Sequence, residues 1–436
     1  MVYWRRTLYT LWFTQFIAIA GFSFVTPFIP YYIQGLGITD TASVALWAGL
    51  SSSACSFALA LMAPVWGALS DRYGRKVMIL RATLIGAVVL ALMGFVVSVQ
   101  QLLALRFLQG VFTGTIAAST TLVAGIVPDE HRGAALGSLQ TAVYLGTTLG
   151  PLMGGVVGDA FGYRRSFWIT GALLLLSGLL VLLFVKEHFQ PAADTLTQRR
   201  PGYRQSLAFL ASGGVLLIAL LTARILLRAG MMIPAPTMAL FVQSLLPGGQ
   251  HAALVTGLIS GSMAIGGALG APLIGNWGDR WGYRPLLIAS GILGVIAFIP
   301  QSLAPSAGWL IVFQFLSGFA EGGTLATTMA LLAGVAAGGH QGTVFGLDAS
   351  ATGLASAIGP LLGAGIAALL GLRAPFILAA AVLGAGVLVV LSRVPRLAPS
   401  HAGAEDESVP RRWRVPTPRL PAFARHRTDR RSSPSR

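Results

Sequence analysis

Stretches of about 20 or more mostly apolar residues recur along almost the whole of this chain. An α-helix needs about 20 such residues to cross the hydrocarbon core of a bilayer. Twelve such stretches are predicted, which leaves little room for a water-soluble domain and makes the chain an all-α membrane protein. Their expected positions are 9–33, 44–66, 77–97, 101–127, 134–158, 166–186, 207–241, 252–275, 285–304, 307–334, 342–370 and 373–393.

The net charge of +16 follows membrane topology rather than nucleic-acid binding. Lys and Arg residues gather in alternate loops between the predicted spans, whereas the intervening loops hold few of them. Because short loops rich in Lys and Arg lie on the cytoplasmic side, both termini are expected there. The basic loop residues are Arg72, Arg75, Lys76, Arg132, Lys186, Arg199, Arg200, Arg204, Arg280 and Arg284.

A charged sequence recurs at half the length of the apolar body. Residues 67–76 read GALSDRYGRK, and residues 275–284, 208 positions further on, read GNWGDRWGYR. Residues 106–110 and 314–318, and residues 149–154 and 358–363, keep nearly the same offset. A fixed offset of this kind indicates a duplicated membrane unit, which is typical of secondary transporters.

The duplication predicts two pseudo-symmetric bundles of six helices. The expected boundaries are an N-terminal bundle at 1–186, a cytoplasmic linker at 187–206 and a C-terminal bundle at 207–393. A tail rich in Pro, Arg and Ser follows at 394–436. This tail has too few apolar residues to fold alone and is expected to be disordered. It is either simply solvated or attracted to anionic lipid headgroups.

The repeated sequence combines glycines with a carboxylate among cations. Gly67 and Gly74 permit tight turns and close helix approach, and Asp71 can pair with its basic neighbours or cap a helix N-terminus. Such a cluster can hold two bundles together in one conformation and release them in another. The predicted gating residues are Gly67, Asp71, Arg72, Gly74, Arg75 and Lys76, with Gly275, Asp279, Arg280 and Gly282 in the second copy.

These residues resemble the signature loop of the major facilitator superfamily, between its second and third helices. The second copy falls where that family has a degenerate repeat, and the resemblance covers about residues 5–395. It implies two six-helix bundles around a central cavity, with transport by alternating access.

Residues 146–155, GTTLGPLMGG, form a second motif in the fifth predicted span. Gly146, Gly150 and Gly154 lie four residues apart and share one helix face, which suits close packing of another helix. Pro151 removes a backbone hydrogen bond, and Gly155 completes the pattern. The segment is either an ordinary small-residue interface or, as it resembles in the superfamily, the element associated with drug:proton antiporters.

Five ionisable residues within predicted spans are candidates for proton coupling. Arg106 resembles a family residue implicated in proton movement, but it could also lie near a helix end and extend to the surface. Arg224 and Arg228 share one helix face. Glu321, among glycines, and Asp348 are either proton carriers or partners of these arginines in static ion pairs.

Adaptable aromatic and Met side chains suit greasy substrates, and Phe24, Tyr31, Tyr144, Met231 and Met232 are the cavity candidates. Prolines 27 and 30, and prolines 234 and 236, predict broken helices at corresponding positions of the two halves. Such breaks indicate a binding site near the middle of the membrane.

The favoured function is proton-coupled export of hydrophobic or amphiphilic compounds, because the chain resembles bacterial tetracycline and multidrug efflux proteins. The expected location is the bacterial inner membrane, with lipid, a small substrate and protons as partners. No nucleic acid, cofactor or metal is expected, the proton gradient serves as energy source, and no catalytic set indicates an enzyme. The alternatives are an exporter of a sugar or other metabolite and a non-transporting receptor. The first and fourth spans lack the acid that many drug antiporters carry there.

Overall fold

A computed structural model describes residues 3–187, 214–246, 251–336 and 341–395. Within these ranges all regular secondary structure is helical. Nearly all of the predicted linker at 187–206 and of the predicted tail at 394–436 lies outside the described residues.

The N-terminal half crosses the molecule six times. The first and fourth crossings are broken helices. The elements are α1 (Tyr3–Val25), η1 (Thr26–Phe28), α2 (Ile29–Gly35), α3 (Thr41–Tyr73), α4 (Arg75–Met93), α5 (Val99–Phe112), α6 (Thr115–Ile126), α7 (Asp129–Phe161) and α8 (Tyr163–Phe184).

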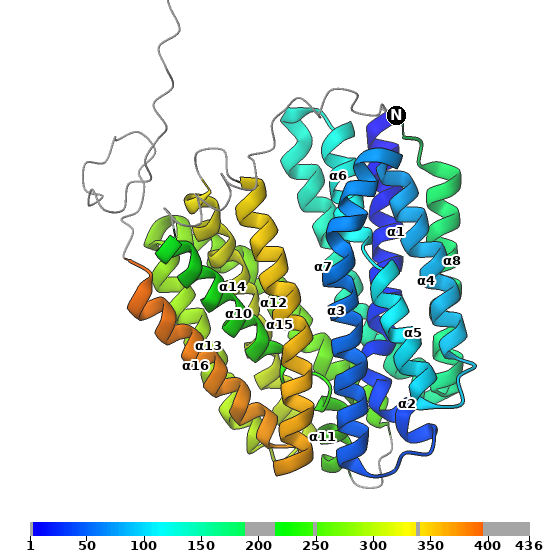
Figure 1. The fold of residues 1–436 in the computed structure, drawn as a ribbon, viewed down its shortest axis with the longest axis vertical. Helices are drawn as coiled ribbons and strands as arrows, with labels where there is room; N and C mark the ends of the chain where they lie inside the picture. Colours follow the sequence, from blue (N-terminus) through cyan, green and yellow to red (C-terminus); the bar gives the residue numbers. More distant parts are fainter. Residues whose placement is uncertain (1–2, 188–213, 247–250, 337–340, 396–436) are drawn as a thin grey trace, which may run out of the picture.

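The C-terminal half repeats this pattern, with a break in its first crossing. Its elements are α10 (Gly214–Met232), α11 (Met238–Leu245), α12 (Ala252–Trp281), α13 (Tyr283–Ser302), α14 (Ala307–Val335), α15 (Gln341–Leu370) and α16 (Ala374–Arg393). The two halves form two six-helix bundles, as the duplication predicts (Figure 1).

Eleven crossings in the described ranges are long and apolar enough to span a membrane. The remaining crossing is α7, a helix of 33 residues. It packs against α1 of its own bundle and α12 of the other. A helix that faces protein on several sides can be less apolar than one that faces lipid.

The start of α1 and the end of α16 lie at one end of the molecule, called here the terminal end (Figure 1). Hydrogen bonds connect neighbouring elements there. Glu187, just after α8, accepts from the backbone N–H groups of Arg75 and Lys76 at 3.0 and 2.7 Å. In the second half, Arg284 donates to the carbonyl of Val394, just after α16, at 2.6 Å. The two repeats therefore close their terminal ends at equivalent places.

The repeated motif is mainly helical rather than a loop. Helix α3 continues to Tyr73 and α12 to Trp281, and each turns at one glycine before the next helix begins. Gly74 has φ 93° and Gly282 φ 85°, values that L residues with a Cβ rarely adopt. These glycines are required by the backbone conformation of the turn.

The two bundles meet along α3 with α15 and along α7 with α12. The contact is most extensive at the end opposite the termini, where α2 meets α11 (Figure 1). From there the bundles diverge toward the terminal end (Figure 1). The proline-associated breaks, η1 and residues 233–237, lie in this opposite contact region rather than at mid-height, which corrects the predicted position.

Candidate functional site

Two ion pairs lie within the C-terminal bundle. The Nε of Arg224 on α10 is 3.1 Å from a carboxylate oxygen of Asp348 on α15, and both side chains are buried. One turn further along α10, Arg228 pairs with Glu321 of α14. The spacing of four residues on α10 places both guanidinium groups on the face that α14 and α15 cover.

The two pairs differ in exposure. The side chains of Arg228 and Glu321 are 28% and 26% exposed, whereas those of Arg224 and Asp348 are 7% and 6% exposed. Electrostatic interaction connects them, because Arg224 feels the charges of Arg228 and Glu321 as well as that of Asp348. The four groups therefore form one charge cluster with a more accessible part and a buried part.

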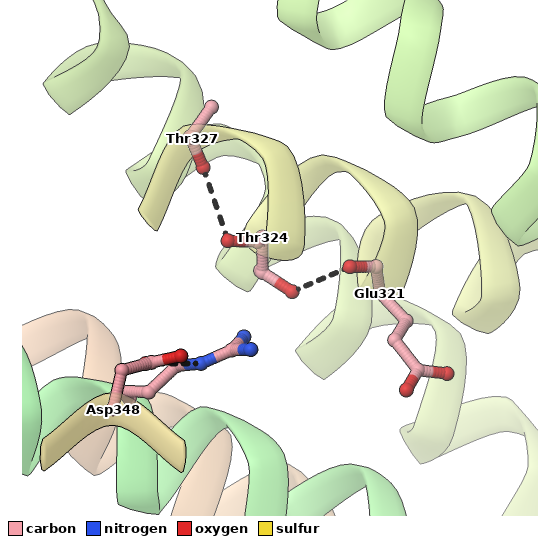
Figure 2. Close-up of polar contacts among 5 residues, drawn as sticks. Glu321, Thr324, Thr327 and Asp348 are labelled. Carbon is pink, nitrogen blue, oxygen red and sulfur yellow. Dashed lines mark hydrogen bonds and ion pairs between the residues drawn. The ribbon is translucent and has the colours of Figure 1, made fainter. Parts of the chain in front are cut away.

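The surroundings of Glu321 on its own helix are polar. Thr324 donates to the backbone carbonyl of Glu321 at 2.8 Å, and Thr327 follows on the same helix (Figure 2). Glu321 therefore has a hydroxyl-bearing neighbour on its own helix in addition to its ion pair with Arg228.

The glycine motif on α7 has two packing faces. Gly146, Gly150 and Gly154 lie against the backbone of α1, and a Cβ at Gly150 would be 2.6 Å from the carbonyl oxygen of Ala20. Gly155 lies against Ala253 of α12. Pro151 also reaches α12, where its carbonyl oxygen would be 2.5 Å from a Cβ at Gly257. The predicted close packing is confirmed, and α7 continues through Pro151 as one helix.

Polar contacts join the bundles at the end opposite the termini. The Tyr31 hydroxyl donates to the carbonyl of Ala239 at 2.7 Å and lies 2.9 Å from the Thr256 hydroxyl. Nearby, Asp159 accepts from the backbone N–H of Leu254 at 3.0 Å. Tyr31 is buried in this contact, where its hydroxyl has partners on the other bundle.

Of three further cavity candidates, two are buried and Met232 is partly buried. Phe24 and Met231 are buried, at 1% and 3% exposure. Met232 packs against Gly359 of α15. The cavity role of these side chains stays a prediction, since composition does not fix which way each helix is rotated in another conformation. Tyr144 remains half-exposed.

Arg106 is buried in the interior of α5 and does not extend to the surface. Its Nη1 donates to the side-chain oxygen of Gln109 at 2.7 Å, while its Nε is buried with no hydrogen-bond partner. Among the described residues, no carboxylate lies within 4.0 Å of this guanidinium.

The charged residues of the repeated motif behave differently in its two copies. Asp71 lies 3.8 Å from Arg75, one turn away, whereas Asp279 accepts from the hydroxyl of Tyr283. Arg72 and Arg280 are exposed. Lys76 donates from Nζ to the carbonyl of Leu182 at 3.0 Å. Gly67 and Gly275 lie in open surroundings, with no heavy atom closer than 3.8 Å to either Cβ position, so neither supports the expected close helix approach.

Arg81 on α4 is a charged residue that the sequence analysis missed. It lines a cavity of about 560 Å³ inside the N-terminal bundle, beside the break between α5 and α6. The detectable signal is simply a cation within the predicted span 77–97. The contact of Arg81 with Trp66 and the break between α5 and α6 arise from tertiary packing, which the sequence pattern does not reveal.

Comparison with known families settles the class of protein. The family model described as Major Facilitator Superfamily matches residues 11–247 and 220–431. The chain belongs to the major facilitator superfamily. It is accordingly a secondary transporter and a multi-pass membrane protein, not an enzyme.

Curated relatives extend the likeness over most of the chain. Multidrug resistance protein MdtG of Enterobacter lignolyticus is 36% identical over 380 residues, which cover 87% of this chain and 90% of the relative. The protein of the same name from Salmonella arizonae is 35% identical over 380 residues, covering 87% and 93%.

Solved structures share the fold at low sequence identity. The nucleoside transporter NupG has a TM-score of 0.71 at 16% identity, covering 89% of this chain and 98% of that one. A bacterial homologue of the human lysosomal transporter Spinster, inward-facing and unoccupied, has a TM-score of 0.69 at 17% identity, covering 90% and 95%. These likenesses concern the architecture.

Proposed function

We propose that this major facilitator protein exports hydrophobic or amphiphilic small molecules in exchange for protons. The observation that carries the proposal is the half-buried pair of Arg228 and Glu321 beside the buried pair of Arg224 and Asp348. Ionisable groups inside membrane spans are costly and are generally functional. The name that the relatives share, multidrug resistance protein MdtG, supports efflux as the direction.

In the proposed cycle, Glu321 accepts a proton when the bundles are open on the side of higher proton concentration. Protonation removes its attraction to Arg228 and weakens the charge cluster between α10, α14 and α15. Substrate binding and proton binding then favour opposite conformations.

We further propose that the terminal end faces the cytoplasm of a bacterial inner membrane, as the arginine-rich loops suggest. The contacts of Tyr31, Asp159 and Gly155 with the other bundle then form the outer gate. In this orientation the divergence of the bundles at the terminal end corresponds to an inward-open conformation (Figure 1). We also propose that residues 187–206 link the two bundles and that the tail at 394–436 lies in the cytoplasm.

Everted bacterial membrane vesicles containing the full chain provide the test. A pH-sensitive dye inside the vesicles reports substrate-induced proton release while a panel of hydrophobic cations and neutral antibiotics is added. We expect release with at least one compound, and loss of release in Glu321→Gln at equal protein level. Glu130→Gln is the matched control, because Glu130 is an exposed acid near the start of α7.

The outcomes separate the proposals. Release that persists in Glu321→Gln contradicts a carrier role for Glu321 and makes Asp348 the next residue to test. Absence of proton movement with every compound, despite correct insertion, contradicts proton-coupled drug export. In that case, uptake assays with sugars and other small metabolites test the alternative exporter.

A further inference from the structure

The N-terminal bundle contains a guanidinium group that has no ion-pair partner among the described residues. Arg81 lies on α4, inside a span of 19 residues that is otherwise apolar after its basic first turn. Among the described residues, no carboxylate lies within 4.0 Å of its guanidinium. In the C-terminal bundle, Arg224 and Arg228 of α10 each have such a partner.

The hydrogen bonds of Arg81 are long and incomplete. Its Nη2 donates to the carbonyls of Phe112 and Thr113, both at 3.4 Å, at the break where Gly114 has φ 130°. Its Nε is buried without a hydrogen-bond partner. These contacts help to satisfy the carbonyls at the end of α5, but they supply no negative charge.

Trp66 of α3 fixes the position of this group. The Cζ of Arg81 lies 3.6 Å from the centre of a Trp66 ring, a cation–π contact. The indole N–H of Trp66 donates to the carbonyl of Val111 at 2.6 Å, which holds the ring against α5. The guanidinium is therefore presented in a defined orientation rather than on a mobile side chain.

The cavity beside Arg81 has the size and lining of a ligand site. Its volume of about 560 Å³ falls within the usual range of about 300–1,000 Å³ for small-molecule pockets. Apolar side chains from α1, α3, α4 and α6 form most of its wall, including Phe22, Leu59, Ala63 and Ile116. Asp71 also lines it, at the terminal end of α3, where Arg75 is 3.8 Å away.

We propose that this cavity binds the anionic group of an amphiphilic molecule, with Arg81 as its counterion and the apolar wall holding its hydrophobic body. A carboxylate or phosphate matches the planar geometry of the guanidinium N–H groups. Such an anion would supply a negative charge and accept a hydrogen bond from the Nε–H of Arg81. If this site is part of the substrate pathway, that role rests on the proposed function. Binding of the anion at Arg81 does not itself require transport.

The test compares two nearly isosteric probes, 1-naphthylacetate and 1-naphthylacetamide, by equilibrium dialysis against the full chain in phosphatidylcholine nanodiscs. Charge-assisted hydrogen bonds contribute about 1.5–3 kcal/mol, so the acid should bind about tenfold or more tightly than the amide. Arg81→Gln should abolish this preference, and Arg5→Gln, at an exposed cation on α1, should retain it.

A second variant keeps the proposal testable if Arg81→Gln does not fold. Ala63→Phe fills the cavity without removing a contact of Arg81, and it should weaken binding of both probes. Nanodiscs containing phosphatidylglycerol identify the natural source of the anion. Displacement of naphthylacetate assigns the site to a lipid phosphate, and undiminished binding assigns it to a free anionic amphiphile.

Equal affinity for the two probes overturns the proposal, as does a preference that survives Arg81→Gln or binding that survives Ala63→Phe. Such a failure leaves proton-coupled export standing, because that is measured by proton release. Conversely, absence of proton release leaves this binding result unaffected.

Discussion

The close approach of α7 to α1 makes a measurable prediction about two glycines on the same helix. At Gly154, an added Cβ would collide with the carbonyl oxygen of Phe24 and lie 2.8 Å from the Phe28 ring. At Gly137, an added Cβ would meet no heavy atom within 4 Å. The pair Gly154→Ala and Gly137→Ala therefore separates packing from helix propensity.

The magnitudes follow from two opposing effects. Replacing Gly by Ala inside a helix stabilises it by about 1 kcal/mol. Overpacking costs about 1–3 kcal/mol, and the upper part of that range applies at Gly154 because the colliding atom belongs to backbone that cannot rotate away. Gly154→Ala should thus lose about 2 kcal/mol net, while Gly137→Ala should gain about 1 kcal/mol.

Denaturant unfolding of the purified proteins in one detergent, followed by far-ultraviolet circular dichroism, measures both changes. The two variants should shift the midpoint in opposite directions. Equal stability of Gly154→Ala and Gly137→Ala would refute the argument that this glycine face is required by contact with α1.

Three further predictions concern charges and the opposite-end contact. Asp348→Asn leaves Arg224 unpaired and should destabilise the protein by about 3–5 kcal/mol. The double variant Arg224→Met/Asp348→Leu should recover most of that stability, and the same denaturant unfolding assay measures both changes. Tyr31→Phe removes two polar contacts between the bundles, each contributing about 1 kcal/mol. Labelling of a cysteine introduced between the bundles at this point should therefore rise about tenfold or more. Unchanged labelling contradicts a gate at Tyr31. Ser43 lowers the pKa of Asp40 by hydrogen bonding, so Asp40 stabilises the start of α3 above the ordinary carboxyl pKa and loses this effect as the pH falls through the lowered value. Asp40→Ala should therefore melt earlier than wild type at pH 7, and the difference should vanish in strong acid.

The fold could be predicted because apolar length and the repeated motif are local properties of the chain. Only some of the helix breaks could be predicted from the sequence. Prolines 27, 30, 234 and 236 announce two of them, but the break after α5 has no proline, and span 101–127 was predicted to be continuous. Thr113 and Gly114 interrupt it in contact with Arg81, which belongs to another helix.

The site was harder to predict because helix rotation decides which side chains meet. The sequence allowed either arginine of α10 to pair with either acid, and only the packed bundle assigns Arg224 to Asp348 and Arg228 to Glu321. The same uncertainty placed Phe24 in a cavity, although it is buried against α7. By contrast, the glycine face of α7 was predictable, because spacing of four fixes a face whatever its neighbour.

The most direct measurement of the central claim uses the neutral double variant Arg228→Met/Glu321→Gln in proteoliposomes. This variant removes both charges, so it avoids leaving one unpaired. With an imposed pH gradient, wild type should accumulate the hydrophobic cation ethidium, and the double variant should exchange it only downhill. Gradient-driven accumulation at the wild-type rate in the double variant would contradict proton coupling through Glu321 and would reduce the pair to a static connection between α10 and α14.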